Sequence, residues 1–283
     1  MKLLVDSGST KADWIAIDNN GKVLFTTQTL GLNPEVLNNN EVIERLNDKF
    51  DISHNKKKAT HLYFYGAGCG TERMKNFLSE VFQKYFTNAV ISVHEDTYAA
   101  VYATTPKNEK AIVCILGTGS NCSYFDGNVL HQKVQSLGYI AMDDCSGNRF
   151  GRHLLRGYYF NKMPKALAKE FEEEYNLDAD YIKSNLYKEP NPNAYLATFA
   201  KFLIKHKDTE FCKKLIYAEM EEFVNNYIMQ FKNYKEIPVH FVGSIAFYLK
   251  EELEEVLTKY GITLGNVLRR PIDGLIAYHV LNK

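Results

Sequence analysis

The feature that most constrains this chain is a strand–turn–strand–turn–strand pattern that occurs twice. In the first copy, residues 2–29, an apolar strand precedes a Ser/Gly turn, a second strand, an Asn-Asn-Gly hairpin turn and a returning strand. The second copy, residues 111–134, repeats this order, and its turn at 118–121 matches the turn at 7–10 in residue type. The alternative to a true repeat is that the two segments resemble each other by chance, because Gly/Ser turns are common. The repeat predicts two domains that each open with the same unit.

The rest of the first third alternates strand and helix signals, which is typical of a partly parallel α/β sheet with crossover helices. We expect strands at 61–65 and 89–94 and helices at 41–50, 72–86 and 97–103. A polar stretch at 105–110 then ends the pattern. We therefore predict an N-terminal domain over residues 1–108 and a C-terminal domain over residues 109–283.

The C-terminal domain is expected to carry helical additions. A helical insert is predicted at about 150–232, and apolar residues at helical spacing mark an amphipathic helix over 211–231. A strand at 237–243, a helix at 245–259 and a last helix at 272–282 follow. The sequence leaves open whether the last helix packs back on the N-terminal domain.

Composition excludes several classes of function. The 283 residues suggest about two domains, and the 34 basic and 34 acidic residues cancel, which argues against nucleic-acid or membrane partners. The longest apolar run, residues 111–116, is far shorter than the roughly 20 residues of a membrane span. The N-terminus shows no signal-peptide pattern. We expect a soluble cytoplasmic protein, and a homodimer is left open.

The cysteines indicate neither disulfides nor a metal site. The sequence has five of them, an odd number, and they are widely spaced with no CxxC pair. We expect them to be buried thiols. They are Cys69, Cys114, Cys122, Cys145 and Cys212.

Three Gly-containing turns each follow an apolar strand, at residues 6–10, at 117–121 and at Gly243-Ser244. Glycine lets the backbone approach an anion closely, and successive N–H groups in a tight turn can bind a phosphate. No P-loop pattern is present, and after residue 120 the chain enters a strand rather than the helix of a dinucleotide fold. Taken singly, each turn could equally be an ordinary hairpin.

Two aspartates stand at the ends of predicted strands. Asp6 ends the first strand, where a carboxylate could hold a hydrated Mg²⁺ beside phosphates, although it could also cap the turn. Asp96 ends a later strand and begins a helix, where it could act chemically or simply cap that helix.

The order of these motifs resembles the actin/hexokinase/70-kDa chaperone ATPase superfamily. Within it, the chain is most similar to the N-acetylglucosamine kinases of the benzoyl-CoA-reductase-activator-like ATPase family, over nearly its whole length. DSGSTKADW (6–14) and GTGSNC (117–122) resemble the two phosphate motifs. VHEDTYAA (93–100) resembles the first connecting segment, and VGSIAFYL (242–249) resembles the adenosine motif.

The resemblance implies two domains with duplicated ribonuclease-H-like βββαβα cores, with ATP bound in the cleft between them. By this resemblance Asp96 is the general base that deprotonates the sugar 6-hydroxyl, and the strand-end position of Asp6 makes it the candidate Mg²⁺ ligand. The sugar is contacted by Asn33, Asn121 and Asp143. The residues implied to bind ATP are Asp6, Gly8, Ser9, Thr10, Lys11, Gly117, Thr118, Gly119, Ser120, Gly243 and Ser244.

The loop at 136–147 departs from the family pattern. Leu137 stands where the family has tryptophan, Met142 and Cys145 replace glycines, and Asp144 replaces glutamate. These changes leave the acceptor sugar unsettled.

Three functions follow from these observations. The first is an ATP-dependent kinase for the 6-hydroxyl of N-acetylglucosamine or a related hexosamine. The second is an ATPase that activates a partner enzyme through an iron–sulfur cluster bridging two subunits. The third is a catalytically degenerate, sugar-sensing protein, which the altered loop would suit.

Overall fold

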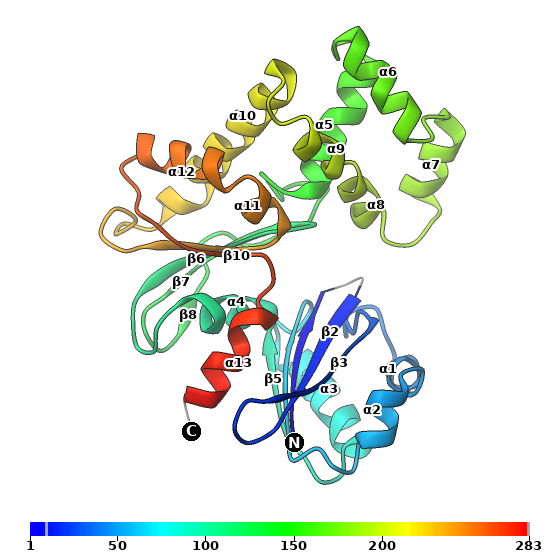
Figure 1. Cartoon of the computed structure of the whole chain (residues 1–283), viewed down its shortest axis with the longest axis vertical. Coiled ribbons are helices and arrows are strands. Elements are labelled where there is room, and N and C mark those ends of the chain that lie inside the picture. The colour runs from blue at the N-terminus through cyan, green and yellow to red at the C-terminus, as the bar shows by residue number, and fades with distance from the viewer. Residues whose placement is uncertain (9–10, 282–283) are drawn as a thin grey trace. The chain divides into compact units, whose positions relative to one another are not determined.

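The computed structural model of the chain describes residues 1–8 and 11–281. It divides into two compact units, which are described separately (Figure 1). Unit 1 comprises Met1–Lys107 together with Arg270–Lys283, and unit 2 comprises Asn108–Arg269. The segment from Arg270 onward therefore belongs to unit 1. The sequence predicts a C-terminal domain over 109–283 and leaves open whether its last helix packs on the N-terminal domain.

Unit 1 is built on a sheet with the strand order β3-β2-β1-β4-β5. Strands β1, β2 and β3 pair antiparallel, as expected for consecutive hairpins, whereas β1, β4 and β5 pair parallel. The strands are β1 (Lys2–Ser7), β2 (Lys11–Ile17), β3 (Val23–Leu30), β4 (His61–Gly66) and β5 (Val90–Glu95). The predicted strands are thus confirmed to within a few residues.

Helices cover both faces of this sheet, because successive strand residues point to opposite faces and β1 is apolar on each. Leu3 and Val5 belong to the core cluster beneath α1 and α3, and Leu4 belongs to the cluster beneath α4 and α13. The helices of unit 1 are α1 (Asn39–Asn47), α2 (Phe50–Asn55), α3 (Glu72–Tyr85), α4 (Asp96–Thr104) and α13 (Ile272–Leu281).

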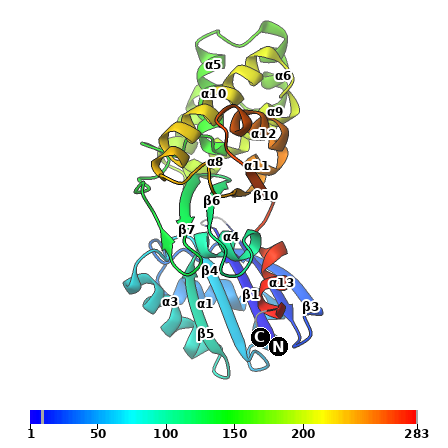
Figure 2. The same ribbon diagram turned by 90° about the vertical axis from the view of Figure 1, so that its left-hand side faces the viewer.

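The last helix, α13, lies beside α4 in both views (Figures 1 and 2). Ile272 and Leu275 are buried in the same cluster as Leu4, so they complete the apolar cover of the sheet. This burial is the physical reason why the chain end belongs to unit 1. The two helices approach closely at Gly274, where an added Cβ would lie 2.6 Å from the carbonyl oxygen of Ala103.

Unit 2 contains a sheet with the order β10-β9-β6-β7-β8. As in unit 1, its first strand is central, pairing antiparallel with the next strand and parallel with the fourth. The strands are β6 (Ala111–Leu116), β7 (Ser120–Phe125), β8 (Leu130–His131), β9 (Val239–Val242) and β10 (Leu264–Leu268). Strand β10 was not predicted from the sequence, because Gly265 and Asn266 interrupt its apolar pattern.

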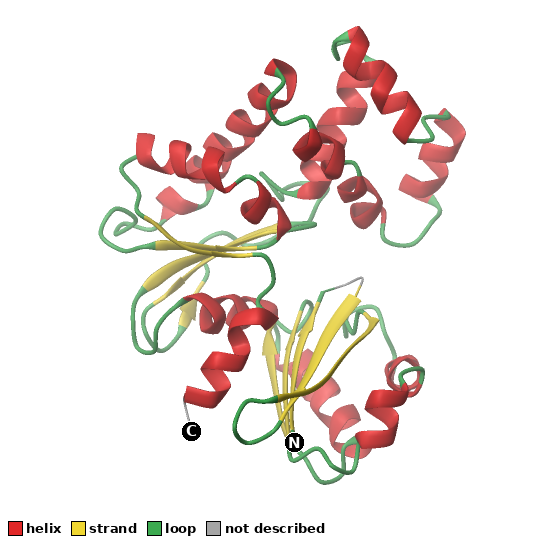
Figure 3. Ribbon diagram, viewed as in Figure 1, coloured by secondary structure: helices red, strands yellow, loops and turns green. Residues whose placement is uncertain are grey.

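The helices of unit 2 gather on one face of its sheet (Figure 3). Together with that face they enclose one large apolar core, in which Cys114, Phe150, Phe223 and Leu253 are buried. The helices of unit 2 are α5 (Gly147–Tyr159), α6 (Lys165–Glu174), α7 (Ala179–Tyr187), α8 (Pro192–Thr198), α9 (Ala200–Lys205), α10 (Glu210–Asn226), the 3₁₀ turn Ile228–Gln230, α11 (Ser244–Tyr248) and α12 (Lys250–Lys259). The helix predicted over 245–259 is interrupted at Leu249, where the backbone leaves the helical conformation.

Among the described residues, no helix is both long and apolar enough to cross a membrane.

The contact between α13 and α4 yields a test of the fold. Gly274→Val should lower the free energy of unfolding by about 1–3 kcal/mol, the usual range for overpacking, because the new side chain meets the Ala103 backbone. Ala277→Val, at an exposed position of the same helix, is the matched control and should change it by less than about 1 kcal/mol. Urea denaturation of both variants measures this difference. Equal effects would mean that the two helices do not pack closely at Gly274.

Candidate functional site

Parallel pairing gathers the predicted site residues of unit 1 at one edge of its sheet. In register, Asp6 pairs with Tyr65, and Tyr65 pairs with His94. The carboxyl ends of β1, β4 and β5 therefore coincide, and Asp96 follows directly as the first residue of α4. The N-cap position of that helix is occupied by Glu95 rather than Asp96.

The electrostatics of this edge are unusual for carboxyl groups. Asp6 and Asp96 are both half-buried. Desolvation, then the negative charges of Asp96 and Asp13, raise the pKa of Asp6 to about 7, although Lys11 and Arg270 oppose the shift. Desolvation and the neighbouring Glu95 raise the pKa of Asp96 to about 6. This edge thus concentrates negative charge that its own cations do not fully offset.

Lys11 is held beside this edge by Asp13. Its ammonium group lies 3.0 Å from Oδ2 of Asp13, and Gln28 donates a hydrogen bond of 2.5 Å to Oδ1 of the same carboxylate. Asp13 is buried and pairs with Asp6 across the β1–β2 hairpin, whereas Lys11 is exposed. An exposed ammonium group with one carboxylate partner keeps further N–H donors, and these are suited to contact an anionic ligand.

Asn33 reaches the same edge through the loop after β3. Ser7 accepts a hydrogen bond of 2.9 Å from the backbone N–H of Leu32, which ties this loop to the end of β1. The Asn33 side chain lies against Gly68, whose φ is +81° and where an added Cβ would overlap the Asn33 Oδ1. The structure therefore places Asn33 at the same edge of the unit 1 sheet as Asp6 and Asp96.

In unit 2, two of the predicted glycine turns meet at the ends of β6 and β9. Ile115 pairs with Val242, so the turn after each strand lies at the same edge. Gly243 has φ +124°, and a Cβ there would overlap the carbonyl oxygen of Leu116. Only glycine fits at this close approach. Ser244 follows at an exposed position.

Asp143 lies against the turn at 117–121. Its Oδ2 would be only 2.7 Å from a Cβ added to Gly119, and its side chain is buried. Ser120 and Asn121 are successive residues of β7, so their side chains point to opposite faces of the sheet. Thr118 is exposed at the tip of the turn.

Asn148, near the start of α5, is a residue that the sequence analysis missed. Its Nδ2 donates to the carbonyl oxygen of Thr118 at 2.7 Å and to Oδ2 of Asp143 at 2.9 Å, and its backbone N–H donates to the same carbonyl at 3.0 Å. It thereby links the turn at 117–121 to Asp143. Within the described part of the chain, the buried Oδ1 of Asn148 has no hydrogen-bond partner. No motif marked it, because an asparagine inside a helix is unremarkable in sequence.

At Gly8 and Gly117, packing alone would also allow a residue with a Cβ. Among the described residues, an added Cβ would meet nothing within 4 Å at Gly117, and at Gly8 it would meet only the Lys11 carbonyl oxygen, at 3.7 Å. Both turns therefore leave room for a group to approach the backbone, as a phosphate does. Ser9 and Thr10 lie outside the described residues.

The unit 1 edge also suits a magnesium ion carried by phosphates. Among the described residues, no group of three or more His, Cys, Asp or Glu side chains is arranged to hold a metal ion. Mg²⁺ bound to phosphates needs only one or two protein carboxylates. Asp6, whose negative charge is poorly offset, fits that role.

Comparison with solved structures gives a full-length match. The chain is 36% identical to a protein from Porphyromonas gingivalis provisionally named an N-acetylglucosamine kinase, with a TM-score of 0.93 and coverage of 100% of this chain and 99% of that chain. Neither a protein-family model nor a curated protein matches the sequence.

More distant structures share the fold. A protein from Chromobacterium violaceum, also provisionally named an N-acetylglucosamine kinase, is 13% identical with a TM-score of 0.70, over 98% of both chains. A ROK family glucokinase from Streptomyces griseus, in complex with glucose and AMPPNP, is 13% identical with a TM-score of 0.59, over 99% of this chain and 98% of that chain.

The raised pKa of Asp6 predicts a pH dependence of stability. Between its ordinary value of 3.8 and about 7, the folded state keeps a proton that the unfolded state has lost, so this group makes the protein less stable as pH rises through that window. Asp6→Asn should therefore be stabilised relative to the wild type more at pH 8 than at pH 4. Thermal unfolding of the two proteins across this range measures the difference.

Asp18→Asn is the control of opposite sign. Backbone hydrogen bonds from Lys22 and Asn20 lower the pKa of Asp18, so its contribution to stability is present above 3.8 and is lost as pH falls. A pH-independent difference between Asp6→Asn and the wild type would contradict the electrostatic description of this edge.

Proposed function

Because the chain belongs to the N-acetylglucosamine kinase-like sugar kinases of the actin-like ATPase superfamily, we propose that it transfers the γ-phosphoryl group of ATP to the 6-hydroxyl of N-acetylglucosamine or a related hexosamine. The 36% identity over the whole chain supports the aminosugar as acceptor. The shared strand order of the two sheets supports duplicated ribonuclease-H-like cores.

The observation that carries the chemistry is the environment of Asp96. Phosphoryl transfer requires mainly positioning, charge stabilisation and one group that accepts the proton of the attacking hydroxyl. A general base is most effective when its pKa lies near the working pH. Asp96 is half-buried, remains accessible at a sheet edge, and has a pKa raised to about 6. We therefore assign it as the base.

On the nucleotide side, the turns at Gly8, Gly117 and Gly119 would present backbone N–H groups to the phosphates, with Lys11 as an additional positive charge. Gly243 and Ser244 would lie under the nucleoside. Bound Mg²⁺ would neutralise negative charge on the phosphates, and Asp6 is the residue proposed to hold it.

On the acceptor side, we propose Asn33, Asn121 and Asp143 as the sugar contacts. Asp143 accepts a hydrogen bond from Asn148, which fixes the direction of its carboxylate. Leu137, which stands where the family has tryptophan, is 68% exposed and so forms no packed wall here. An exposed leucine supports a weaker apolar contact to the sugar than the family tryptophan would provide.

Of the other functions, the activator ATPase is disfavoured by the cysteines. All five side chains are buried, so none is exposed to share an iron–sulfur cluster with a second subunit. A degenerate sugar-sensing protein would bind sugar without turnover, and the following experiment distinguishes it from a kinase.

The proposed function is tested with a coupled ADP-release assay over hexoses and hexosamines. We expect kcat/KM for N-acetylglucosamine to exceed that for glucose by roughly 10- to 200-fold, in the lower part of this range, since one or two polar groups would be left unpaired by glucose. Phosphorus NMR of the product should show a 6-phosphate. Equal values for both sugars would contradict the acceptor, and sugar binding without ADP release would indicate the sugar-sensing protein.

The role of Asp96 has its own test. Asp96→Asn should lower kcat by at least about 10², the usual contribution of a positioned base, while the KM for ATP changes little. Glu72→Gln is the matched control, because Glu72 is also the first residue of a helix in unit 1. It should lose at most about 1 kcal/mol of stability and keep its turnover. Near-normal kcat in Asp96→Asn would exclude it as the base.

A further inference from the structure

The loop that carries Asp143 has an unfavourable backbone conformation. Asp143 and Cys145 have φ values of 66° and 58°, in the left-handed region that residues with a Cβ rarely adopt. Such conformations persist only where surrounding contacts enforce them, and they concentrate at functional sites. The side chains that hold this loop are therefore informative.

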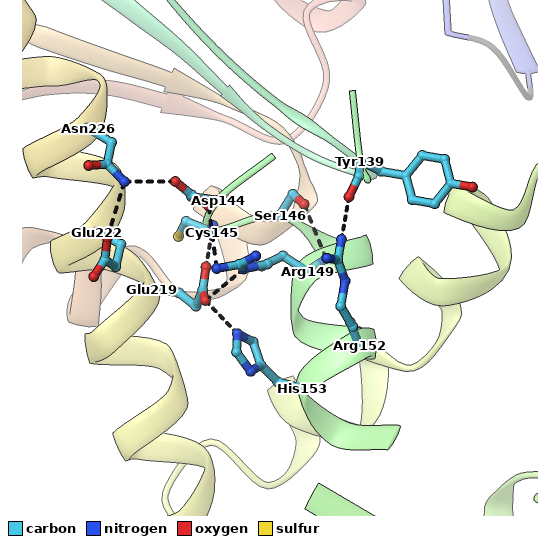
Figure 4. A network of polar contacts seen from close by, with 10 residues as sticks. All are labelled: Tyr139, Asp144, Cys145, Ser146, Arg149, Arg152, His153, Glu219, Glu222 and Asn226. Atoms are coloured by element: carbon cyan, nitrogen blue, oxygen red, sulfur yellow. Dashed lines mark hydrogen bonds and ion pairs between the residues drawn. The ribbon is translucent and has the colours of Figure 1, made fainter. Parts of the chain in front are cut away.

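Glu219, a buried residue of α10, makes the central contact with the loop (Figure 4). Its Oε2 accepts a hydrogen bond of 3.0 Å from the backbone N–H of Cys145. Its Oε1 lies 3.0 Å from Nε of Arg149 and 2.5 Å from Nε2 of His153, both on α5. One carboxylate thus joins the strained residue to the helix that follows it.

The loop is contacted again about two turns further along α10. Asn226 donates a hydrogen bond of 3.0 Å to Asp144, and Arg149 lies 3.7 Å from the other oxygen of that carboxylate (Figure 4). Tyr227, the residue after α10, is buried; burial raises the pKa of its hydroxyl, and the backbone of Asp143 and Asp144 opposes that shift. Residues at i and i+7 share one side of a helix, so Glu219 and Asn226 of α10 both face the loop.

The charge state of Glu219 suits this role. Burial raises its pKa, but hydrogen bonds from His153, from the Cys145 backbone and from Arg149 outweigh burial and lower the pKa to about 2. The carboxylate is therefore ionised at neutral pH, and its hydrogen bonds are of the stronger, charge-assisted kind.

We infer that Glu219 is a positioning residue for the acceptor site: by fixing the Cys145 backbone and Arg149, it holds the left-handed turn that places the Asp143 carboxylate against Gly119. This inference rests on the proposed function, in which Asp143 contacts the sugar. Cys145 is only two residues from Asp143, so movement at one is transmitted to the other through the backbone. Glu219 itself does not touch the sugar.

A purely structural link between α5 and α10 is the alternative, and kinetics separate the two. Glu219→Gln keeps the size and an acceptor oxygen but removes the charge. We expect it to raise the KM for N-acetylglucosamine about 10-fold, the effect of losing one charge-assisted hydrogen bond, while kcat and the KM for ATP change less than about threefold.

Glu252→Gln is the matched control. Glu252 is likewise a buried carboxylate of unit 2, but it pairs with Lys207 at 2.9 Å, away from the loop. It should lose stability to a similar degree and keep both KM values. If Glu219→Gln does not fold, Arg149→Lys replaces it. That variant keeps the charge but loses the guanidinium fork, whose separate nitrogens contact Glu219 and Asp144, and it should shift the sugar KM in the same direction.

The outcomes are distinct. A sugar KM that rises only in the variants of the Glu219 contact supports the inference. An active wild type whose sugar KM is unchanged by Glu219→Gln, or is raised equally by Glu252→Gln, overturns the role of Glu219 and leaves the proposed function standing. A wild type that phosphorylates no sugar overturns both.

Discussion

Parallel pairing is the constraint on which each half of the site depends. Within a parallel set, the carboxyl ends of the strands lie at one edge, and the loops that follow them gather there. Asp6 and Asp96 are 90 residues apart in the sequence, yet β1, β4 and β5 bring them to the same edge of unit 1. In unit 2 the pairing of β6 with β9 does the same for the turns at Gly117 and Gly243. In a sheet of consecutive hairpins, by contrast, only alternate strands end at the same edge.

Gathering carboxylates at one edge has an electrostatic consequence. Desolvation raises the pKa of Asp6, and the negative charges of Asp96 and Asp13 raise it further. Lys11 and Arg270 offset part of this charge. The ionised carboxylate of Asp6 therefore lowers the stability of the folded state at the edge where the candidate site residues gather, as is common at functional sites.

The helical insert of unit 2 has a second role besides packing. Helix α10 buries Phe223 and Val224 in the large core, and it also directs Glu219 to the strained turn at Cys145. In unit 1 the comparable dependence is on α13, since this helix covers a sheet face that includes Leu4. Unit 1 therefore cannot bury its complete core until α13 is present.

The sequence by itself determined the local features. Apolar runs and turn residues predicted most strands and helices, and the glycine turns and strand-end aspartates predicted most of the candidate site residues, because these depend on neighbouring residues. Strand β10 escaped prediction, since Gly265 and Asn266 disrupt its pattern and only pairing with β9 makes it a strand.

Contacts between distant segments were decided by the tertiary structure alone. Helix α13 joins unit 1 because Ile272 and Leu275 find an apolar face there, and nothing in their own segment specifies that face. Asn148 and Glu219 acquire their roles from the Thr118 carbonyl and the Cys145 N–H, which are backbone groups that every sequence contains. Hydrogen bonds to the backbone leave no mark in residue type, so only the folded arrangement reveals them.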